Sequence, residues 1–144
     1  MSQPKVLIVE DDQPIRTLMV AAMRHEPLEI HTAPDGLEAL ELVRAHDYAV
    51  ILLDLMLPRV NGFEFLERLD AVKRPSAAPV TIVMTAFDGA PVKRLGAMRV
   101  QAILHKPFDI ERVVEMVRDC ALLHQEHVSA CKRPVSEQSQ TTAS

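Results

Sequence analysis

The feature that most constrains the fold of this chain is a series of short hydrophobic runs separated by stretches with helical periodicity. The runs occupy residues 5–10, 29–33, 50–54, 80–85 and 102–105. Most of them are aliphatic and lack polar alternation, as expected for strands that are buried on both faces. The run at 29–33 is more polar, so we expect it at an edge of the sheet. Strands that alternate with helices form βαβ units, with a parallel sheet between two layers of helices.

Helical patterns lie between these runs and after the last one. The predicted helices cover residues 14–26, 37–45, 63–72, 88–100 and 110 onward. Pro14 suits a first helical turn, and Asp109 is the predicted N-cap of the last helix. In the second helix we expect Leu37, Leu40 and Val43 to face the core. The whole pattern matches the α/β, flavodoxin-like, doubly wound (βα)5 fold, with a five-stranded parallel sheet in the order 2-1-3-4-5.

Composition limits what the chain can be. Its 144 residues and 48% hydrophobic content suit one folded domain, which we place at residues 1–124, followed by a polar, disordered tail at 125–144. The net charge of −4 offers no electrostatic footprint for nucleic acid or an anionic membrane. No aliphatic run approaches the roughly 20 residues of a membrane helix, and the first residues do not resemble a signal peptide. Two cysteines make no disulfide framework, so a reducing, cytoplasmic location fits best.

Polar side chains gather where the predicted strands end. The residues at these ends are Glu10, Asp11, Asp12, Asp54, Thr85 and Lys106. Alone, each is typical of a turn, a helix cap or a surface charge, but the carboxyl ends of parallel strands share one rim, where ligand sites form. Aspartates that meet there cannot all stay ionised without a counter-charge. Mg²⁺ on one side and Lys106 on the other would supply it.

These residues make the chain resemble the receiver domain of bacterial two-component response regulators, in particular the single-domain, chemotaxis-regulator-like members. The resemblance covers about residues 4–123. It rests on Glu10-Asp11-Asp12, Asp54 within DLMLP, Gly62, Thr85-Ala86 and Lys106-Pro107-Phe108.

The resemblance implies a phosphorylation site. Asp54 would be the phosphoacceptor, a carboxylate nucleophile. Asp11, Asp12 and Asp54 would bind the Mg²⁺ cofactor, with the backbone carbonyl of Met56 as a further ligand. The metal would neutralise phosphoryl oxygens during in-line transfer. The protein would therefore be a phosphoacceptor signalling protein rather than an enzyme with a separate substrate, with self-catalysed phosphorylation and dephosphorylation.

The resemblance also implies a switch. Lys106 would pair with Asp54 before transfer, and Thr85 would donate its hydroxyl to a phosphoryl oxygen afterwards. The peptide bond before Pro107 would be cis. The family usually has Tyr or Phe three residues before the lysine, but this chain has Ile103 there. An aromatic rotamer switch therefore cannot operate.

Three residues flank the predicted phosphorylation site. Met56 and Phe87 are bulky and apolar, and Ala86 follows Thr85. In the family such positions influence how easily water attacks the acyl phosphate. Two interpretations remain open: Met56 and Phe87 shield the phosphoryl group and prolong its lifetime, or they simply pack.

The expected partners follow from the same resemblance. The phosphodonor would be a phosphohistidine on a sensor histidine kinase or histidine phosphotransfer protein, and the output a protein target bound through helix 4, strand 5 and helix 5. A homodimer through that face is common in the family, but no residue pattern here indicates one. No direct contact with nucleic acid and no membrane insertion are expected. A receiver module within a larger DNA-binding or enzymatic regulator is the nearest alternative.

Other functions are less well supported by the sequence. An Mg²⁺-dependent phosphohydrolase of the haloacid dehalogenase type needs a second Asp two residues after the nucleophile, and that position is Met56. With four glycines, the chain lacks both the dinucleotide fingerprint and the P-loop. A receiver that acts without phosphorylation is argued against by the complete acidic set, and only Ile103 favours it.

A stripe of metal-ligand residue types occurs on the last helix, at Cys120, His124, His127 and Cys131. Cysteine and histidine are zinc ligands. One straight helix cannot surround an ion with four ligands, so we interpret this stripe as incidental.

Overall fold

The computed structural model describes residues 3–72, 78–86 and 100–132, with side chains described as far as residue 126. Its centre is a five-stranded sheet in the order β2-β1-β3-β4-β5, and every adjacent pair is parallel. The strands are β1 (Lys5–Val9), β2 (Glu29–Ala33), β3 (Val50–Asp54), β4 (Val80–Thr85) and β5 (Ala102–His105). The predicted fold class and strand order are confirmed, and the more polar strand β2 lies at an edge.

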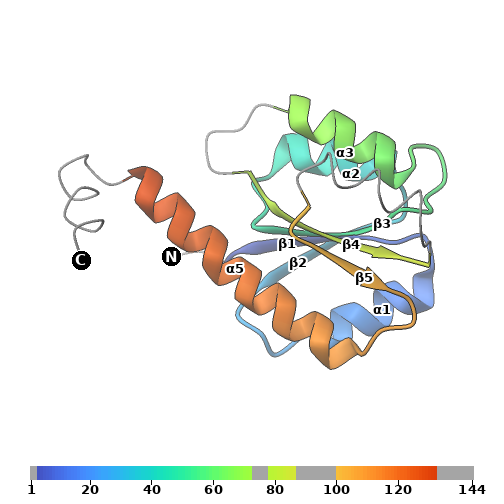
Figure 1. The fold of residues 1–144 in the computed structure, drawn as a ribbon, viewed down its shortest axis with the longest axis horizontal. Helices are drawn as coiled ribbons and strands as arrows, with labels where there is room; N and C mark the ends of the chain where they lie inside the picture. The colour runs from blue at the N-terminus through green and yellow to red at the C-terminus, as the bar shows by residue number, and fades with distance from the viewer. Residues whose placement is uncertain (1–2, 73–77, 87–99, 133–144) are drawn as a thin grey trace.

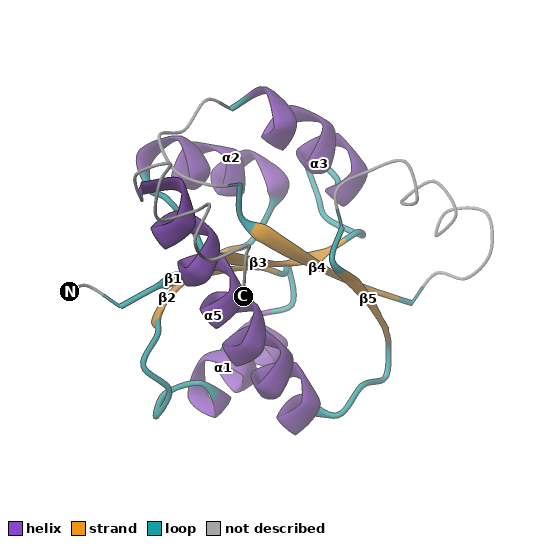
Figure 2. Cartoon of the chain, turned by 60° about the vertical axis from the view of Figure 1, so that its left-hand side comes forward, coloured by secondary structure: helices purple, strands orange, loops and turns teal. Residues whose placement is uncertain are grey.

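Helices cover both faces of this sheet (Figure 1). They are α1 (Gln13–Ala22), α2 (Gly36–Ala45), α3 (Gly62–Ala71) and α5 (Ile110–Lys132). Figure 2 shows α2 and α3 together on one side of the strands and α1 and α5 on the other. The helix predicted at 88–100 lies outside the described residues, apart from residue 100.

Two hydrophobic clusters hold the layers together, because successive side chains of a strand point to opposite faces of the sheet. Leu7, Ile51 and Leu53 pack under α2 and α3. Their neighbours along the strands, such as Ile8 and Leu52, pack against α1 and α5. Strands β1 and β3 are buried at almost every position. Their carboxyl ends are thereby fixed in a rigid frame.

Each helix that follows a strand begins with an Asx residue. The side chains of Asp12, Asp35 and Asn61 accept hydrogen bonds from the backbone N–H three residues later, as N-caps do. The carboxylate of Asp109 accepts from the N–H of Glu111, in accordance with its predicted capping role. These caps anchor the loops that leave the rim of the sheet.

Three details differ from the sequence predictions. Leu37, expected in the core, is 38% exposed, because Ala39, Leu40 and Val43 form the buried face of α2. Helix α1 ends at Ala22, before the predicted end at 26, and the chain then turns. Helix α5 continues to Lys132, so the first part of the predicted tail is helical.

No helix in the described part of the chain is both long enough and hydrophobic enough to cross a membrane.

Candidate functional site

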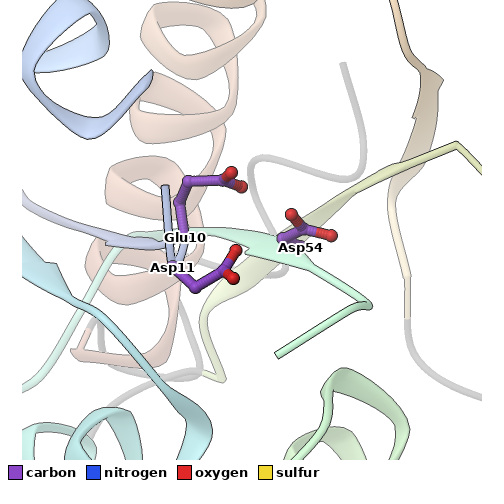
Figure 3. Close-up of side chains that lie close together, drawn as sticks. All are labelled: Glu10, Asp11 and Asp54. Carbon is purple, nitrogen blue, oxygen red and sulfur yellow. The ribbon is translucent and has the colours of Figure 1, made fainter. Parts of the chain in front are cut away.

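Three carboxylates meet at the carboxyl ends of β1 and β3. Glu10, Asp11 and Asp54 each offer one oxygen, and these atoms all lie within 4.8 Å of one another. Figure 3 shows Glu10 and Asp11 leaving the end of β1 and Asp54 on the neighbouring strand. Glu10 is 1% exposed and Asp54 is 4% exposed, whereas Asp11 lies in contact with solvent. The site is therefore a partly buried acidic cluster that opens to solvent on one side.

Strand register explains why Glu10 belongs to this cluster. Val6 pairs with Val50 and Ile8 with Leu52. Continuing the same register places Glu10 beside Asp54, and the N–H of Glu10 still donates to Ala33 O at 3.1 Å. The sequence analysis places Glu10 in the acidic motif at this rim but gives it no role as a metal ligand. The constant register between β1 and β3 is the signal that could have identified it as a site residue.

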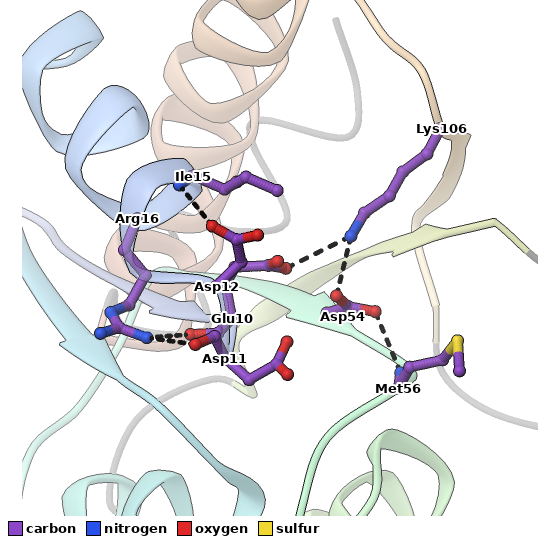
Figure 4. Close-up of polar contacts among 8 residues, drawn as sticks. All are labelled: Glu10, Asp11, Asp12, Ile15, Arg16, Asp54, Met56 and Lys106. Carbon is purple, nitrogen blue, oxygen red and sulfur yellow. Dashed lines mark hydrogen bonds and ion pairs between the residues drawn. The ribbon is translucent and has the colours of Figure 1, made fainter.

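Lys106 approaches the cluster from the end of β5. Its Nζ lies 2.8 Å from Asp54 Oδ2 and 3.5 Å from Glu10 Oε2 (Figure 4). Desolvation lowers the pKa of Lys106, but the hydrogen bond to Asp54 and the negative charges of Asp54 and Glu10 outweigh it, so the pKa is raised. Lys106 is therefore held in its charged form. The predicted cis peptide bond before Pro107 is confirmed.

One lysine does not neutralise the cluster. Burial, together with the hydrogen bond to Asp54 and the charge of Asp54, raises the pKa of Glu10 to about 8. In the metal-free protein the site thus favours a proton on Glu10 near neutral pH. The raised pKa follows from burial of Glu10 and from the negative charge of the neighbouring Asp54.

The donor set fits a hard divalent cation. All three groups offer carboxylate oxygens, which Mg²⁺ prefers, and a bound cation would supply the missing charge. The separation of the oxygens is small enough for one ion to contact them. The backbone of Met56 lies at the same place, since its N–H donates to Asp54 Oδ1 at 3.0 Å.

Asp12 lies apart from this group. Its Oδ1 accepts a hydrogen bond from the N–H of Ile15 at 3.2 Å, which caps α1. Next to it, Arg16 donates from Nη1 to the carbonyl oxygens of Glu10 at 2.7 Å and Asp11 at 3.0 Å. Sequence reasoning missed this arginine, which fixes the backbone that carries the acidic pair.

The remaining predicted site residues lie around the same rim. Thr85 is fully buried at the end of β4, and its carbonyl accepts from the N–H of Lys106 at 2.8 Å. Ile103 pairs with Val83 and packs, partly buried, against the core under α2 and α3. Ala86 is exposed.

One of the two bulky flanking residues, Met56, lies at the surface. The Met56 side chain is among the exposed large hydrophobic groups, with 56% of the residue accessible. Phe87 lies outside the described residues.

The first two residues of the stripe on α5, Cys120 and His124, are buried. Cys120 lies in the core against α1, and desolvation raises the pKa of its thiol, with a smaller contribution from Asp119. The side chains of His127 and Cys131 lie outside the described residues.

Comparison with known proteins gives the family. Residues 6–118 match the family described as response regulator receiver domain, which is most of the chain, and the chain belongs to that family. The acidic triad is typical of the magnesium site of receiver domains. Such domains are typically phosphoacceptor signalling proteins of two-component systems.

Individual relatives agree with this assignment. The chain is 32% identical over 117 residues to response regulator ArlR of Staphylococcus aureus, covering 79% of this chain and 51% of the relative. It thus spans about half the length of the curated relatives it matches.

Solved structures agree as well. One neighbour is the Francisella response regulator 1452 receiver domain, with a TM-score of 0.70 and 27% identity, covering 82% of this chain and 96% of that one. Another is chemotaxis protein CheY4 of Vibrio cholerae, with a TM-score of 0.70 and 26% identity, covering 82% and 98%.

Proposed function

We propose that this protein receives a phosphoryl group on Asp54 from the phosphohistidine of a sensor histidine kinase or histidine phosphotransfer protein, in a reaction that needs Mg²⁺. One observation carries this proposal. Asp54 is a buried carboxylate at the end of β3, bonded to Lys106 at 2.8 Å and grouped with two further carboxylates. The cluster opens to solvent at Asp11, from where a phosphodonor can approach, and the Lys106 ammonium supports the charge of Asp54.

The metal ligands in this proposal are Asp11, Asp54 and the backbone carbonyl of Met56, with Glu10 in the place that the sequence analysis gave to Asp12. The reason is geometric: Glu10 shares the cluster, while the Asp12 carboxylate caps α1. When bound, Mg²⁺ would neutralise charge on the phosphoryl oxygens. Binding would also displace the proton from Glu10, because the cation favours its ionised form.

The transfer step uses the Asp54 carboxylate as the nucleophile. An Asp54 oxygen attacks the phosphorus in line, a new oxygen–phosphorus bond forms, and the phosphorus–nitrogen bond of the donor breaks. The imidazole nitrogen keeps the bonding electron pair. Lys106 already touches Asp54 Oδ2, so its ammonium can follow the charge onto a phosphoryl oxygen with little movement.

Output in this proposal begins at Thr85 and Lys106. The Thr85 hydroxyl would bind another phosphoryl oxygen. The backbone hydrogen bond from the Lys106 N–H to the Thr85 carbonyl would couple the motion of these two residues. The affected surface would be the predicted helix at 88–100 together with β5 and α5, and a protein target would bind it. With Ile103 partly buried in the core, the change would pass through backbone and aliphatic packing instead of an aromatic rotamer.

The biological setting is part of the proposal. We expect a cytoplasmic protein that works by contact with other proteins, without direct nucleic-acid binding by this domain, since its net charge is −4. A role as the receiver module of a larger regulator stands beside a stand-alone role. A gene that continues beyond residue 144 into an output domain would decide for the larger regulator.

The test is chemical. The protein is incubated with Mg²⁺ and acetyl phosphate, and its intact mass is measured beside an EDTA control and an Asp54→Asn variant. The proposal predicts one phosphoryl adduct that requires both Mg²⁺ and Asp54. An adduct that persists in Asp54→Asn would place the chemistry elsewhere. A folded protein with no adduct from acetyl phosphate or from a histidine kinase would contradict the proposal.

A further inference from the structure

The loop between β3 and α3, residues 55–61, contains the one non-glycine residue with positive φ in the described part of the chain. Arg59 has φ of 66°, in the left-handed region that side chains disfavour. A backbone conformation of this kind costs free energy and persists only where the surroundings enforce it. The same loop carries Met56, the backbone partner of Asp54. The cause of the Arg59 conformation therefore bears on the phosphorylation site.

An ion pair holds Arg59 to a different part of the fold. Its Nε and Nη2 donate to Asp35 Oδ2 at 3.0 and 2.5 Å. The Arg59 side chain is 57% exposed, but that of Asp35 is only 8% exposed. The other oxygen of Asp35 accepts from the N–H of Glu38 at 2.8 Å and caps α2. Asp35 thus joins the loop and the first turn of α2 through its two oxygens.

The electrostatics of Asp35 agree with a firm pair. Burial alone would raise the pKa of this carboxyl group. The hydrogen bonds from the Glu38 N–H and the Arg59 guanidinium outweigh burial and hold the pKa below its ordinary value. Asp35 is consequently a charged, buried anchor at neutral pH.

Close backbone packing accompanies the ion pair. A Cβ on Gly36 would lie 2.0 Å from Val60 O, so the start of α2 presses directly on the loop. At the far end of the loop, Gly62 donates to Leu55 O at 3.0 Å. The loop is thus fixed at its ends by backbone contacts, and the pair of Asp35 and Arg59 fixes its middle.

From this arrangement we infer that Asp35 and Arg59 are positioning residues for the phosphorylation site, which hold the β3–α3 loop so that the Met56 backbone stays aimed at Asp54. The inference rests on the proposed function, because it concerns the metal that Asp54 and Met56 would share. Within the described part of the chain, neither residue belongs to the acidic cluster and neither forms an ion pair with Lys106. Their effect is transmitted through the loop.

The experiment measures Mg²⁺ binding to the unphosphorylated protein by isothermal titration calorimetry, independently of phosphorylation. Asp35→Asn keeps an N-cap, since Asn caps as well as Asp, but removes the charge that holds Arg59. Arg59→Gln removes the guanidinium, and the double variant combines both changes. Arg68→Gln is the matched control, because Arg68 is similarly exposed and lies 3.9 Å from Glu64 on α3.

Each single variant is expected to bind Mg²⁺ about tenfold more weakly, the usual effect of losing a group that supports a metal ligand. The double variant should be no weaker than the singles, because one interaction is lost in every case. Arg68→Gln should bind as the unchanged protein does. Arg59→Gly also removes the ion pair but accepts the positive φ without strain, so it should lose less Mg²⁺ affinity than Arg59→Gln.

The outcomes separate the two proposals. If the unchanged protein binds Mg²⁺ and accepts a phosphoryl group on Asp54 but all the variants bind Mg²⁺ equally well, the positioning role is wrong and the proposed function stands. If the unchanged protein itself fails to bind Mg²⁺ and to accept phosphate, the proposed function fails first.

Discussion

Two loops bring the backbone and side chains of the site together, and they are held in different ways. The β1–α1 connection is short, so Glu10 and Asp11 follow the strand directly and Asp12 already caps α1. The β3–α3 loop is longer and strained at Arg59, and it depends on Asp35 and Gly36 of α2. This difference indicates that the geometry of a short loop is set by the strand that it follows, whereas a longer loop needs contacts from a neighbouring element.

The largest expected effect comes from a substitution that disrupts the contact between α2 and the β3–α3 loop. Exchanging glycine for alanine inside a helix ordinarily stabilises it by about 1 kcal/mol. In Gly36→Ala the new Cβ would meet the backbone at Val60, so we expect destabilisation of about 2–3 kcal/mol instead. Urea unfolding monitored by circular dichroism measures it. A variant as stable as the unchanged protein would show that α2 does not press on this loop.

The next effect concerns the short loop and pH. The pKa of Glu10 is about 8 in the folded, metal-free protein, against an ordinary value of 4.5. The folded state keeps a proton that the unfolded state has already lost, so stability falls as pH rises from about 4.5 to about 8. Below about pH 4.5, the stabilising contribution of the protonated Glu10 side chain is fully present.

Glu10→Gln should remove this fall. We expect the difference in the free energy of unfolding between Glu10→Gln and the unchanged protein, in EDTA, to shift in favour of the variant by more than about 1.4 kcal/mol from pH 4.5 to 8. Added Mg²⁺ should stabilise the unchanged protein at pH 8. Parallel pH profiles for the two proteins would contradict the raised pKa.

A smaller effect distinguishes the capping role of Asp12 from the metal-binding role of Asp11 in the β1–α1 loop. Asp12→Ala should destabilise the protein by about 1 kcal/mol through loss of the α1 cap, and Asp12→Asn should restore most of that. Asp11→Asn, by contrast, should weaken Mg²⁺ binding at least about tenfold, equivalent to 1.4 kcal/mol. Calorimetric titration of both Asn variants is the measurement. Equal losses of Mg²⁺ affinity in Asp11→Asn and Asp12→Asn would show that Asp12 is a metal ligand as well.

The smallest effect tests how firmly the short loop is held. Arg16→Met removes the guanidinium that bonds the Glu10 and Asp11 carbonyls, but water can replace it at this partly exposed position. We expect a loss of about 0.5–1 kcal/mol in unfolding experiments. A loss as large as that of Gly36→Ala would mean that both loops depend equally on outside support.

Sequence reasoning reached much of the fold because its signals are local. Strand β3 ends at Asp54 as predicted, and Asp109 accepts a hydrogen bond at the start of α5, as its residue type indicated. Leu37 was assigned to the core from periodicity alone. The packing of α2 against the sheet selected Ala39 and its neighbours instead.

The site was predicted less completely, because parts of it are set by tertiary structure. Lys106 and Asp54 could be paired from their positions at strand ends. Asp12 could not be told from Glu10 as a site residue, since a cap and a ligand look alike in a run of three acids. The ion pair between Asp35 and Arg59 joins two loops that are far apart in the sequence, and no local sequence pattern predicts it.

The central claim is that Asp54 carries the phosphoryl group, and site mapping tests it most directly. The protein is treated with acetyl phosphate and Mg²⁺, the acyl phosphate is reduced with borohydride, and peptides are sequenced by mass spectrometry. Reduction of an aspartyl phosphate yields homoserine at the modified position. We predict homoserine at position 54 and at no other acidic residue of the cluster. Homoserine at position 11 or 12, with Asp54 unmodified, would contradict the account.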